Sequence, residues 1–187
     1  MIVKIYQIYQ YIRFIEDKTM LDTIKQQLPD FAKDMRLNLS KVLDFTQLDG
    51  LTEQQITGAA LAVAYQLNNK ELIVTLSKLA NDEKTVEAAK LATSLMAMTN
   101  IYYRFVHLSG QAELTQMPAG LRMQGITNPG VDRVTFEVLC LAVSALNGCG
   151  TCISSHSRQL QEHGFSTSAL ARIGRYSSLY YSHCLYW

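Results

Sequence analysis

The sequence has little of what interrupts helices or builds β-hairpins. Only three prolines occur in 187 residues, and no Asn-Gly or Gly-Gly turn joins two alternating strands. The chain also lacks the run of about 20 apolar residues that a membrane-spanning helix requires. It has no cluster of lysine and arginine, and its net charge is only +1. These absences favour an all-α chain that binds neither membrane nor nucleic acid.

Cysteine is also scarce. The chain has four cysteines, which are too few for a disulfide scaffold of this size. The first 14 residues include Lys4 and Arg13 but no continuous apolar core and no small-residue cleavage site, unlike a signal peptide. The composition, 48% apolar and 18% charged, is typical of one globular domain. We therefore expect a protein of the reducing cytoplasm.

Three segments differ in character. Residues 1–19 are crowded with Ile and Tyr and carry no helix cap. They form either an extra helix or an extension before a start at Met20, and we favour the extension. Residues 20–171 have helical periodicity and form the expected domain. Residues 172–187 form an atypical tail that is rich in aromatics, without caps and poorly amphipathic, so no clear helix is predicted there.

Short polar breaks separate the predicted helices of the domain. Thr52 and Gln55 have the spacing of a capping box, which marks a helix start. The stretch 111–130 is the longest irregular segment, and we expect it to rim a functional site. The predicted helices cover approximately residues 31–43, 56–67, 71–80, 85–107, 131–146 and 151–163.

A faint internal repeat is visible at an offset of 49 residues. It lays residues 92–107 on residues 141–156, so that Asn100 falls on Cys149 and His107 on His156. This alignment predicts that the first segment is a degenerate copy of the second helical hairpin.

The chain is organised around two cysteines with the spacing Cys149-x-x-Cys152, followed by His156 and preceded by Glu137. Three features are expected to lower the pKa of the Cys152 thiol and so to favour the nucleophilic thiolate. Cys152 lies in the first turn of a predicted helix, where free N–H groups stabilise an anion. Cys149 can donate a hydrogen bond to it, and His156 is at position i+4 on the same helix face.

The position of the imidazole favours Cys152 as the peroxide-reactive thiol, which becomes a sulfenic acid, with Cys149 as its resolving partner. Glu137 would orient His156 or join it in a proton relay through water. The spacing places His156 within reach of Cys152, but it does not place Glu137.

Other interpretations of these residues stay open. Cys149, Cys152, His156 and His163 are four potential zinc ligands, although His163 follows His156 by seven residues, which exceeds the usual spacing. The two thiols can also be purely structural, and Glu137 can be a surface acid. Outside the motif, we expect Cys140 to lie in the core and His107 at a helix end, whereas His183 and Cys184 carry little signal.

Three stretches resemble one known family, namely PDFAKDMRLNLSKV (29–42), GLRMQGITNPG (120–130) and FEVLCLAVSALNGCGTCISSH (136–156). They are similar to the alkyl hydroperoxide reductase D (AhpD) proteins of the carboxymuconolactone decarboxylase-like superfamily. The resemblance covers about residues 20–165, and its pattern E-x₁₁-C-x-x-C-x₃-H is quite specific.

The resemblance implies an all-α fold with two similar halves, a homo-oligomer that is commonly a trimer, and an antioxidant activity. The implied reactions are reduction of hydroperoxides and of the partner peroxiredoxin AhpC. No tightly bound cofactor is implied, because electrons come from a dihydrolipoyl group on a 2-oxoacid dehydrogenase subunit, regenerated by lipoamide dehydrogenase and NADH. By motif, Cys152 resembles the cysteine that becomes sulfenic acid, Cys149 the proton donor and disulfide partner, and Glu137 and His156 the proton relay.

The chain departs from the family at three places. Thr151 occupies the position between the cysteines where some members have a second histidine, so activity or its pH dependence can differ. Residues 1–19 have no family counterpart, and after about Ala171 an Ala-rich helix is replaced by the aromatic tail. These departures leave two alternatives to a peroxidase. One is a low-turnover redox adaptor that binds AhpC or a lipoyl domain, and the other is a decarboxylase-type enzyme of the wider superfamily.

Overall fold

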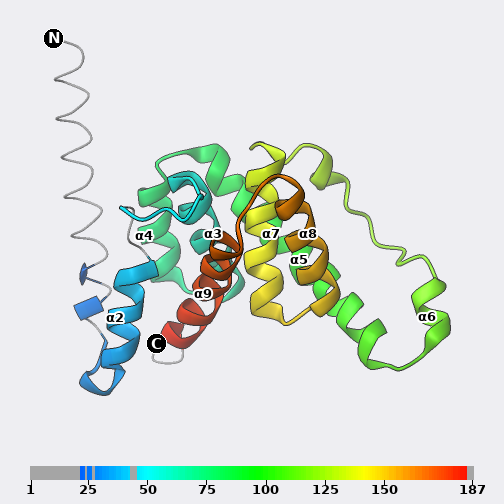
Figure 1. The fold of residues 1–187 in the computed structure, drawn as a ribbon, viewed down its shortest axis with the longest axis horizontal. Helices are drawn as coiled ribbons and strands as arrows, with labels where there is room; N and C mark the ends of the chain where they lie inside the picture. The colour runs from blue at the N-terminus through cyan, green and yellow to red at the C-terminus, as the bar shows by residue number, and fades with distance from the viewer. Residues whose placement is uncertain (1–21, 24, 27, 43–45, 185–187) are drawn as a thin grey trace, which may run out of the picture.

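The protein folds as a bundle of helices in the computed structural model, which describes residues 22–184 except 24, 27 and 43–45 (Figure 1). No strand occurs among these residues, so the all-α prediction is confirmed. The elements are η1 (Asp30–Ala32), α2 (Lys33–Val42), α3 (Glu53–Gln66), α4 (Lys70–Ala80), α5 (Glu83–Leu108), α6 (Ala112–Gln116), η2 (Gln124–Thr127), α7 (Arg133–Asn147), α8 (Gly150–Glu162) and α9 (Thr167–Cys184).

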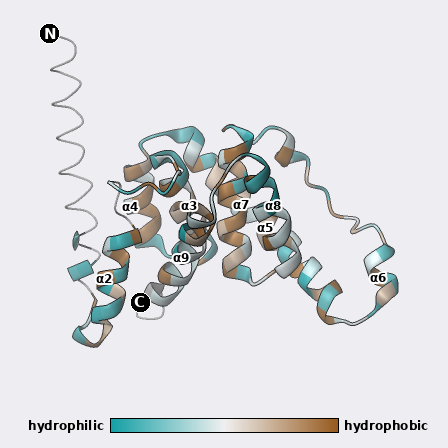
Figure 2. Cartoon of the chain, in the orientation of Figure 1, coloured by the Kyte–Doolittle hydropathy of each residue, from teal (hydrophilic) through white to brown (hydrophobic). Residues whose placement is uncertain are grey.

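Helices α3 and α7 form the centre of the bundle and pack against each other. In each, ten consecutive residues are buried, Gln55–Ala64 in α3 and Thr135–Ser144 in α7. Both are rich in small and aliphatic side chains, which allow other helices to approach from all sides (Figure 2). The long helix α5 packs against both of them, and so does α9. The core therefore lies around α3 and α7, and the site is built at the end of α7.

The fold consists of two similar three-helix units, α3–α5 and α7–α9. An offset of 80 residues relates α3 to α7 and α4 to α8, and Leu61-Ala-Val63 matches Leu141-Ala-Val143. In the third helices, the hydroxyl of Thr93 donates to the Ala62 carbonyl at 2.9 Å, and that of Ser177 to the equivalent Ala142 carbonyl at 2.6 Å. The expectation of two similar halves is therefore confirmed.

The predicted offset of 49 residues is wrong. It lays a continuous stretch of α5 on the end of α7, the turn after it and the start of α8, so one helix is matched to two. At the offset of 80, Asn69 instead corresponds to Cys149 as a helix N-cap, and Leu72 and Leu76 correspond to Cys152 and His156. Both leucines are fully buried. In the first half of the fold, apolar side chains therefore occupy the positions that carry a thiol and an imidazole in the second half.

The predicted helix boundaries within the domain agree with the structure to within a few residues. The capping box of α3 is formed, because Gln55 N–H donates to the Thr52 hydroxyl while Thr52 N–H donates to the Gln55 side chain. The expected irregular stretch 111–130 contains the short elements α6 and η2. Among the described residues, no helix is both long and apolar enough to cross a membrane. The predicted extension, residues 1–19, lies outside the described part of the chain.

The segment from residue 172, for which the sequence predicts no clear helix, is helical as far as Cys184, because α9 runs without interruption across residue 172. Tyr176 and Tyr180, which make this segment look atypical, are fully buried in α9, which packs against α2, α3 and α7. Arg172 is also buried, where it donates to the Val42 carbonyl and pairs with Asp49. Because polar and aromatic residues occupy buried positions of α9, its buried face does not appear as an apolar stripe in the sequence.

Tyr176 joins α9 to the end of α2, and replacing it with phenylalanine should cost about 1–3 kcal/mol of unfolding free energy. Its hydroxyl donates to the Val42 carbonyl at 3.0 Å and accepts from Arg172 Nε at 3.0 Å. Burial also raises the pKa of Tyr176 to about 12. Urea denaturation of Tyr176→Phe measures the loss, and Tyr181→Phe is the control, since Tyr181 is exposed on the same helix. Equal stability of the two variants would contradict this role.

Candidate active site

The two cysteines of the motif lie at the junction of α7 and α8. Gly148 ends α7 in the left-handed conformation with φ 65°, which glycine adopts without steric cost. Cys149 N–H then donates to the Ser144 carbonyl at 3.2 Å, and Cys149 becomes the N-cap of α8. This tight turn holds both cysteines at the N-terminus of α8, where unpaired N–H groups favour negative charge.

Cys149 and Cys152 form a disulfide, with their Cα atoms 5.3 Å apart. Cys149 Sγ also accepts a hydrogen bond from Cys152 N–H at 3.3 Å, so this sulfur is the capping group of the helix. Cys149 is 0% exposed and Cys152 is 8% exposed. The C-terminal cysteine of the pair is therefore the more accessible one, in contrast to the usual order in such motifs.

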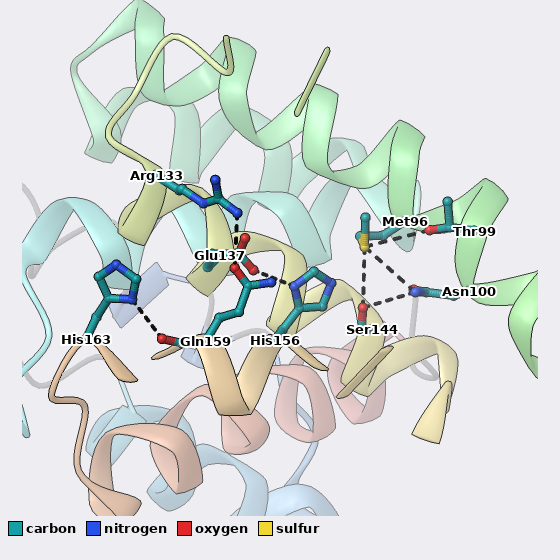
Figure 3. A network of polar contacts seen from close by, with 9 residues as sticks. All are labelled: Met96, Thr99, Asn100, Arg133, Glu137, Ser144, His156, Gln159 and His163. Carbon is teal, nitrogen blue, oxygen red and sulfur yellow. Dashed lines mark hydrogen bonds and ion pairs between the residues drawn. The ribbon is translucent and has the colours of Figure 1, made fainter. Parts of the chain in front are cut away.

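Glu137 and His156 face each other across the contact between α7 and α8 (Figure 3). His156 Nδ1 is 2.6 Å from Glu137 Oε2, and both side chains are largely buried. The two residues thus contact directly, without the water that the sequence allowed between them. Since Cys152 and His156 are four residues apart on α8, the thiol and the imidazole share a helix face. A carboxylate that orients an imidazole beside a thiol is an arrangement suited to proton transfer.

A second pair links the same two helices next to Glu137 and His156. Arg133 Nη2 donates to Gln159 Oε1 at 3.2 Å, and both side chains lie beside the Glu137–His156 pair in Figure 3. His163 Nδ1 interacts with the Gln159 carbonyl of its own helix at 2.8 Å. Within the described residues, no three His, Cys, Asp or Glu side chains gather as a metal site would require. His163 is thus not brought together with the other three ligands of the zinc alternative.

The remaining candidate residues lie apart from this cluster. Cys140 is buried in α7, and burial raises the pKa of its thiol well above the usual range, as expected of an inert core cysteine. His107 lies in the last turn of α5, at a helix end as predicted. Thr151 is exposed in the first turn of α8, between the two cysteines. The side chains of His183 and Cys184 lie outside the described part of the structure.

Sequence reasoning missed a polar network that joins α5 to the end of α7. Asn100 Nδ2 donates to Ser144 Oγ at 3.0 Å, and Asn147 Nδ2 donates to Asn100 Oδ1 at 3.1 Å. Arg104 Nη1 donates to the Asn147 carbonyl at 2.5 Å. Met96 Sδ lies 3.5 Å from Ser144 Oγ within the same network (Figure 3). The only signal in the sequence was the presence of Asn100 in an otherwise apolar stretch of α5.

Comparison with known proteins identifies relatives of this chain. Residues 112–179 match the Carboxymuconolactone decarboxylase family. The chain is 50% identical over 163 residues to alkyl hydroperoxide reductase AhpD of Coxiella burnetii (strain RSA 493 / Nine Mile phase I), covering 86% of this chain and 92% of that protein. The AhpD proteins of Rhodopseudomonas palustris (strain BisB18) and Bradyrhizobium sp. (strain BTAi1 / ATCC BAA-1182) are 43% and 44% identical, each covering 85% of this chain and 88% of the relative. The chain therefore belongs to the AhpD family of the carboxymuconolactone decarboxylase-like superfamily.

Proposed function

We propose that the protein is an antioxidant, lipoyl-dependent alkyl hydroperoxide reductase. The observation that carries this proposal is the Cys149–Cys152 pair at the N-terminus of α8, beside the direct Glu137–His156 contact. Membership of the AhpD family supports a peroxide-reducing antioxidant role in general. The dithiol–disulfide cycle, the proton relay and the identity of the reductant are the finer parts of the proposal.

In the first half of the cycle, the Cys152 thiolate attacks a peroxide oxygen and the O–O bond breaks. Cys152 becomes a sulfenic acid, and an alcohol leaves after it takes a proton. The Glu137–His156 pair removes the thiol proton and returns it to the leaving oxygen. Cys149 then attacks the sulfenic sulfur, water leaves, and the disulfide forms. The greater exposure of Cys152 supports this assignment, because the peroxide must reach the attacking sulfur.

In the second half of the cycle, a dihydrolipoyl group returns two electrons and two protons. One of its thiolates attacks the disulfide, and the second releases the mixed disulfide as oxidised lipoyl. Cys149 has no exposed surface, so we propose that the reductant attacks Cys152 and that Cys149 leaves. The Cys149 sulfur accepts the Cys152 N–H, which would stabilise it as a leaving thiolate.

The proposed partners follow from this electron route. A lipoyl-bearing 2-oxoacid dehydrogenase subunit supplies the dihydrolipoyl group, and lipoamide dehydrogenase regenerates it without contacting this protein. The reduced dithiol also reduces the peroxiredoxin AhpC by disulfide exchange. We place these reactions in the cytoplasm, where thiols are kept reduced.

Thiol counting tests the cycle. One equivalent of cumene hydroperoxide should remove two titratable thiols from the reduced protein, and dihydrolipoamide should restore both. Tryptic mass spectrometry should locate the loss to the peptide that carries Cys149 and Cys152. An unchanged thiol count would contradict the proposed activity.

The adaptor and decarboxylase alternatives make different predictions. The exposed Thr151 replaces a potential base between the cysteines, which favours slow peroxide turnover in an adaptor. Stopped-flow measurement should then give oxidation too slow for turnover while reduced AhpC still accumulates. A decarboxylase should convert a lactone acid even after alkylation of every thiol. Rapid, thiol-dependent peroxide reduction would argue against both.

We also propose that the protein is a homo-oligomer, namely a trimer. Residues 107–134, which the structure describes throughout, contain no buried side chain, although they include α6 and η2. Figure 1 shows α6 and the loop after it projecting from the other helices. The preceding part of α5 exposes apolar side chains at helical spacing, namely Met98, Ile101, Phe105 and Leu108. A second copy of the chain would cover this stripe and compensate for the entropy of ordering the projecting segment.

Light scattering with size-exclusion chromatography should give three times the mass of the chain for the wild-type protein. Phe105→Glu should shift it to monomer, because a charge in an apolar interface is costly to desolvate. Val74→Glu is the matched control, since Val74 is also exposed and apolar but lies on α4. A monomeric wild-type protein would overturn the proposed assembly.

A further inference from the structure

The turn that carries Cys149 is held by side chains of α5, although α5 belongs to the other three-helix unit. Asn100 on α5 contacts Ser144 and Asn147, which lie one turn apart at the end of α7. Arg104, one turn further along α5, donates to the Asn147 carbonyl. The Ser144 carbonyl in turn accepts the Cys149 N–H. We call Asn100 and Arg104 the α5 clamp.

Within the clamp, Asn100 is buried and its amide has a partner at each end, whereas Arg104 is exposed. Asn100 is only 1% exposed and Ser144 is fully buried. The Asn100 amide uses both ends, because Nδ2 donates to Ser144 while Oδ1 accepts from Asn147. A buried amide with matched partners on both ends specifies one arrangement, because any shift leaves a donor or an acceptor unpaired. The last turn of α7 is therefore fixed relative to α5.

No contact of the clamp involves a cysteine sulfur. The hydrogen bonds join Asn100 and Arg104 to Ser144 and Asn147, and so none of them requires the disulfide. The same contacts are available when Cys149 and Cys152 are reduced. They would then keep Cys149 at the N-cap of α8 and close to Cys152, which raises the effective concentration of one thiol near the other.

We propose that Asn100 and Arg104 are positioning residues that set the reduction potential of the Cys149–Cys152 pair. This inference rests on the dithiol–disulfide cycle of the proposed function. Without the clamp, the reduced turn gains conformational freedom that disulfide formation must remove again. The disulfide is then less favoured at equilibrium and easier to reduce. The clamp thereby makes the centre a stronger reductant.

The test is the equilibrium of the full-length protein with mixtures of reduced and oxidised dithiothreitol at pH 7. In each direction two electrons and two protons pass between the dithiothreitol pair and the Cys149–Cys152 pair. Alkylation and mass spectrometry give the fraction of disulfide. For Asn100→Ala we expect the equilibrium constant for disulfide formation to fall about tenfold, which corresponds to a potential ~30 mV more positive.

Arg104→Met is the second variant, because Arg104 is at the surface and its loss leaves no buried cavity. We expect a fall of about threefold in the same direction. The sign is informative. If Arg104 acted instead as a charge that stabilises a thiolate, its removal would disfavour the reduced state and raise the equilibrium constant.

Thr93→Val is the matched control for loss of a hydrogen bond from α5. The Thr93 hydroxyl donates from the same helix to the Ala62 carbonyl of α3, away from the α7 turn. This variant should lose stability in urea but keep the wild-type potential. An unchanged or larger equilibrium constant in Arg104→Met, or an equal shift in Thr93→Val, would overturn the proposal. Because the measurement needs neither peroxide nor a lipoyl protein, its result is independent of whether the proposed activity holds.

Discussion

Replacing Cys152 with serine should lower peroxide turnover by about a thousandfold or more. A serine hydroxyl has almost no ionised fraction at neutral pH and cannot form a sulfenic acid or a disulfide, so both halves of the cycle are lost. The substitution only replaces the Cys152 sulfur with an oxygen at the start of α8, and the N-cap sulfur of Cys149 stays in place. The measurement is NADH consumption with lipoamide dehydrogenase, lipoamide and cumene hydroperoxide.

Cys149→Ser separates the roles of the two thiols. Cys152 should still consume one equivalent of peroxide, but the sulfenic acid would persist, since no resolving thiol is present. A dimedone adduct on Cys152 would detect it. Cys140→Ser is the control, because Cys140 is a buried thiol of α7 outside the motif and should leave turnover near the wild-type rate. If Cys152→Ser consumed an equivalent of peroxide and Cys149→Ser consumed none, the assigned roles would be reversed.

The sequence predicted the helices and the motif well, because both depend on local patterns. The Cys149–Cys152 spacing and the glycine at 148 follow from the chemistry of one turn. Contact between Glu137 and His156 does not follow from local chemistry in this way. From the turn, Glu137 lies roughly 15 Å back along α7, whereas His156 lies roughly 9 Å forward along α8. Whether they meet therefore depends on how the two helices cross, which a single sequence does not reveal.

Two features of the fold differ from the sequence-based predictions for physical reasons. The offset of 49 rests on similar apolar residues, which recur in any helix with a buried face. The offset of 80 relates residues of different chemistry, such as Asn69 and Cys149, that have the same structural role as N-caps. Helix α9 is not clear from the sequence because the segment is rich in aromatics and poorly amphipathic; in the structure Arg172 and Ser177 are also buried, and both donate to backbone carbonyls.

Replacing Glu137 with glutamine tests the proton relay. The amide keeps the size of the side chain and can still contact His156 Nδ1, so the fold should be retained. It cannot hold the negative charge that stabilises a protonated imidazole. We expect kcat/KM for peroxide to fall about a hundredfold, within the range typical of lost general acid–base catalysis. Stopped-flow oxidation of the reduced protein measures this step separately from the reductive half of the cycle.

His156→Gln should be less stable than Glu137→Gln, whereas both variants should show the same kind of kinetic defect, a lower kcat/KM. It leaves the Glu137 carboxylate buried without its imidazole partner, and an unpaired buried charge is strongly destabilising. In the double variant no unpaired carboxylate remains at position 137, so stability should partly recover. Its kcat/KM should be no lower than that of either single variant, because the two residues act as one unit.

Thr57→Val is the matched control for both variants, since Thr57 is buried on α3 at the position that corresponds to Glu137 in the first half of the fold. It changes a buried polar group without touching the site, so peroxide oxidation should keep its wild-type rate. If the losses in kcat/KM from Glu137→Gln and His156→Gln simply multiplied in the double variant, the residues would act independently. The 2.6 Å contact between them would then be a structural pairing, and proton transfer to and from Cys152 would have to use another group.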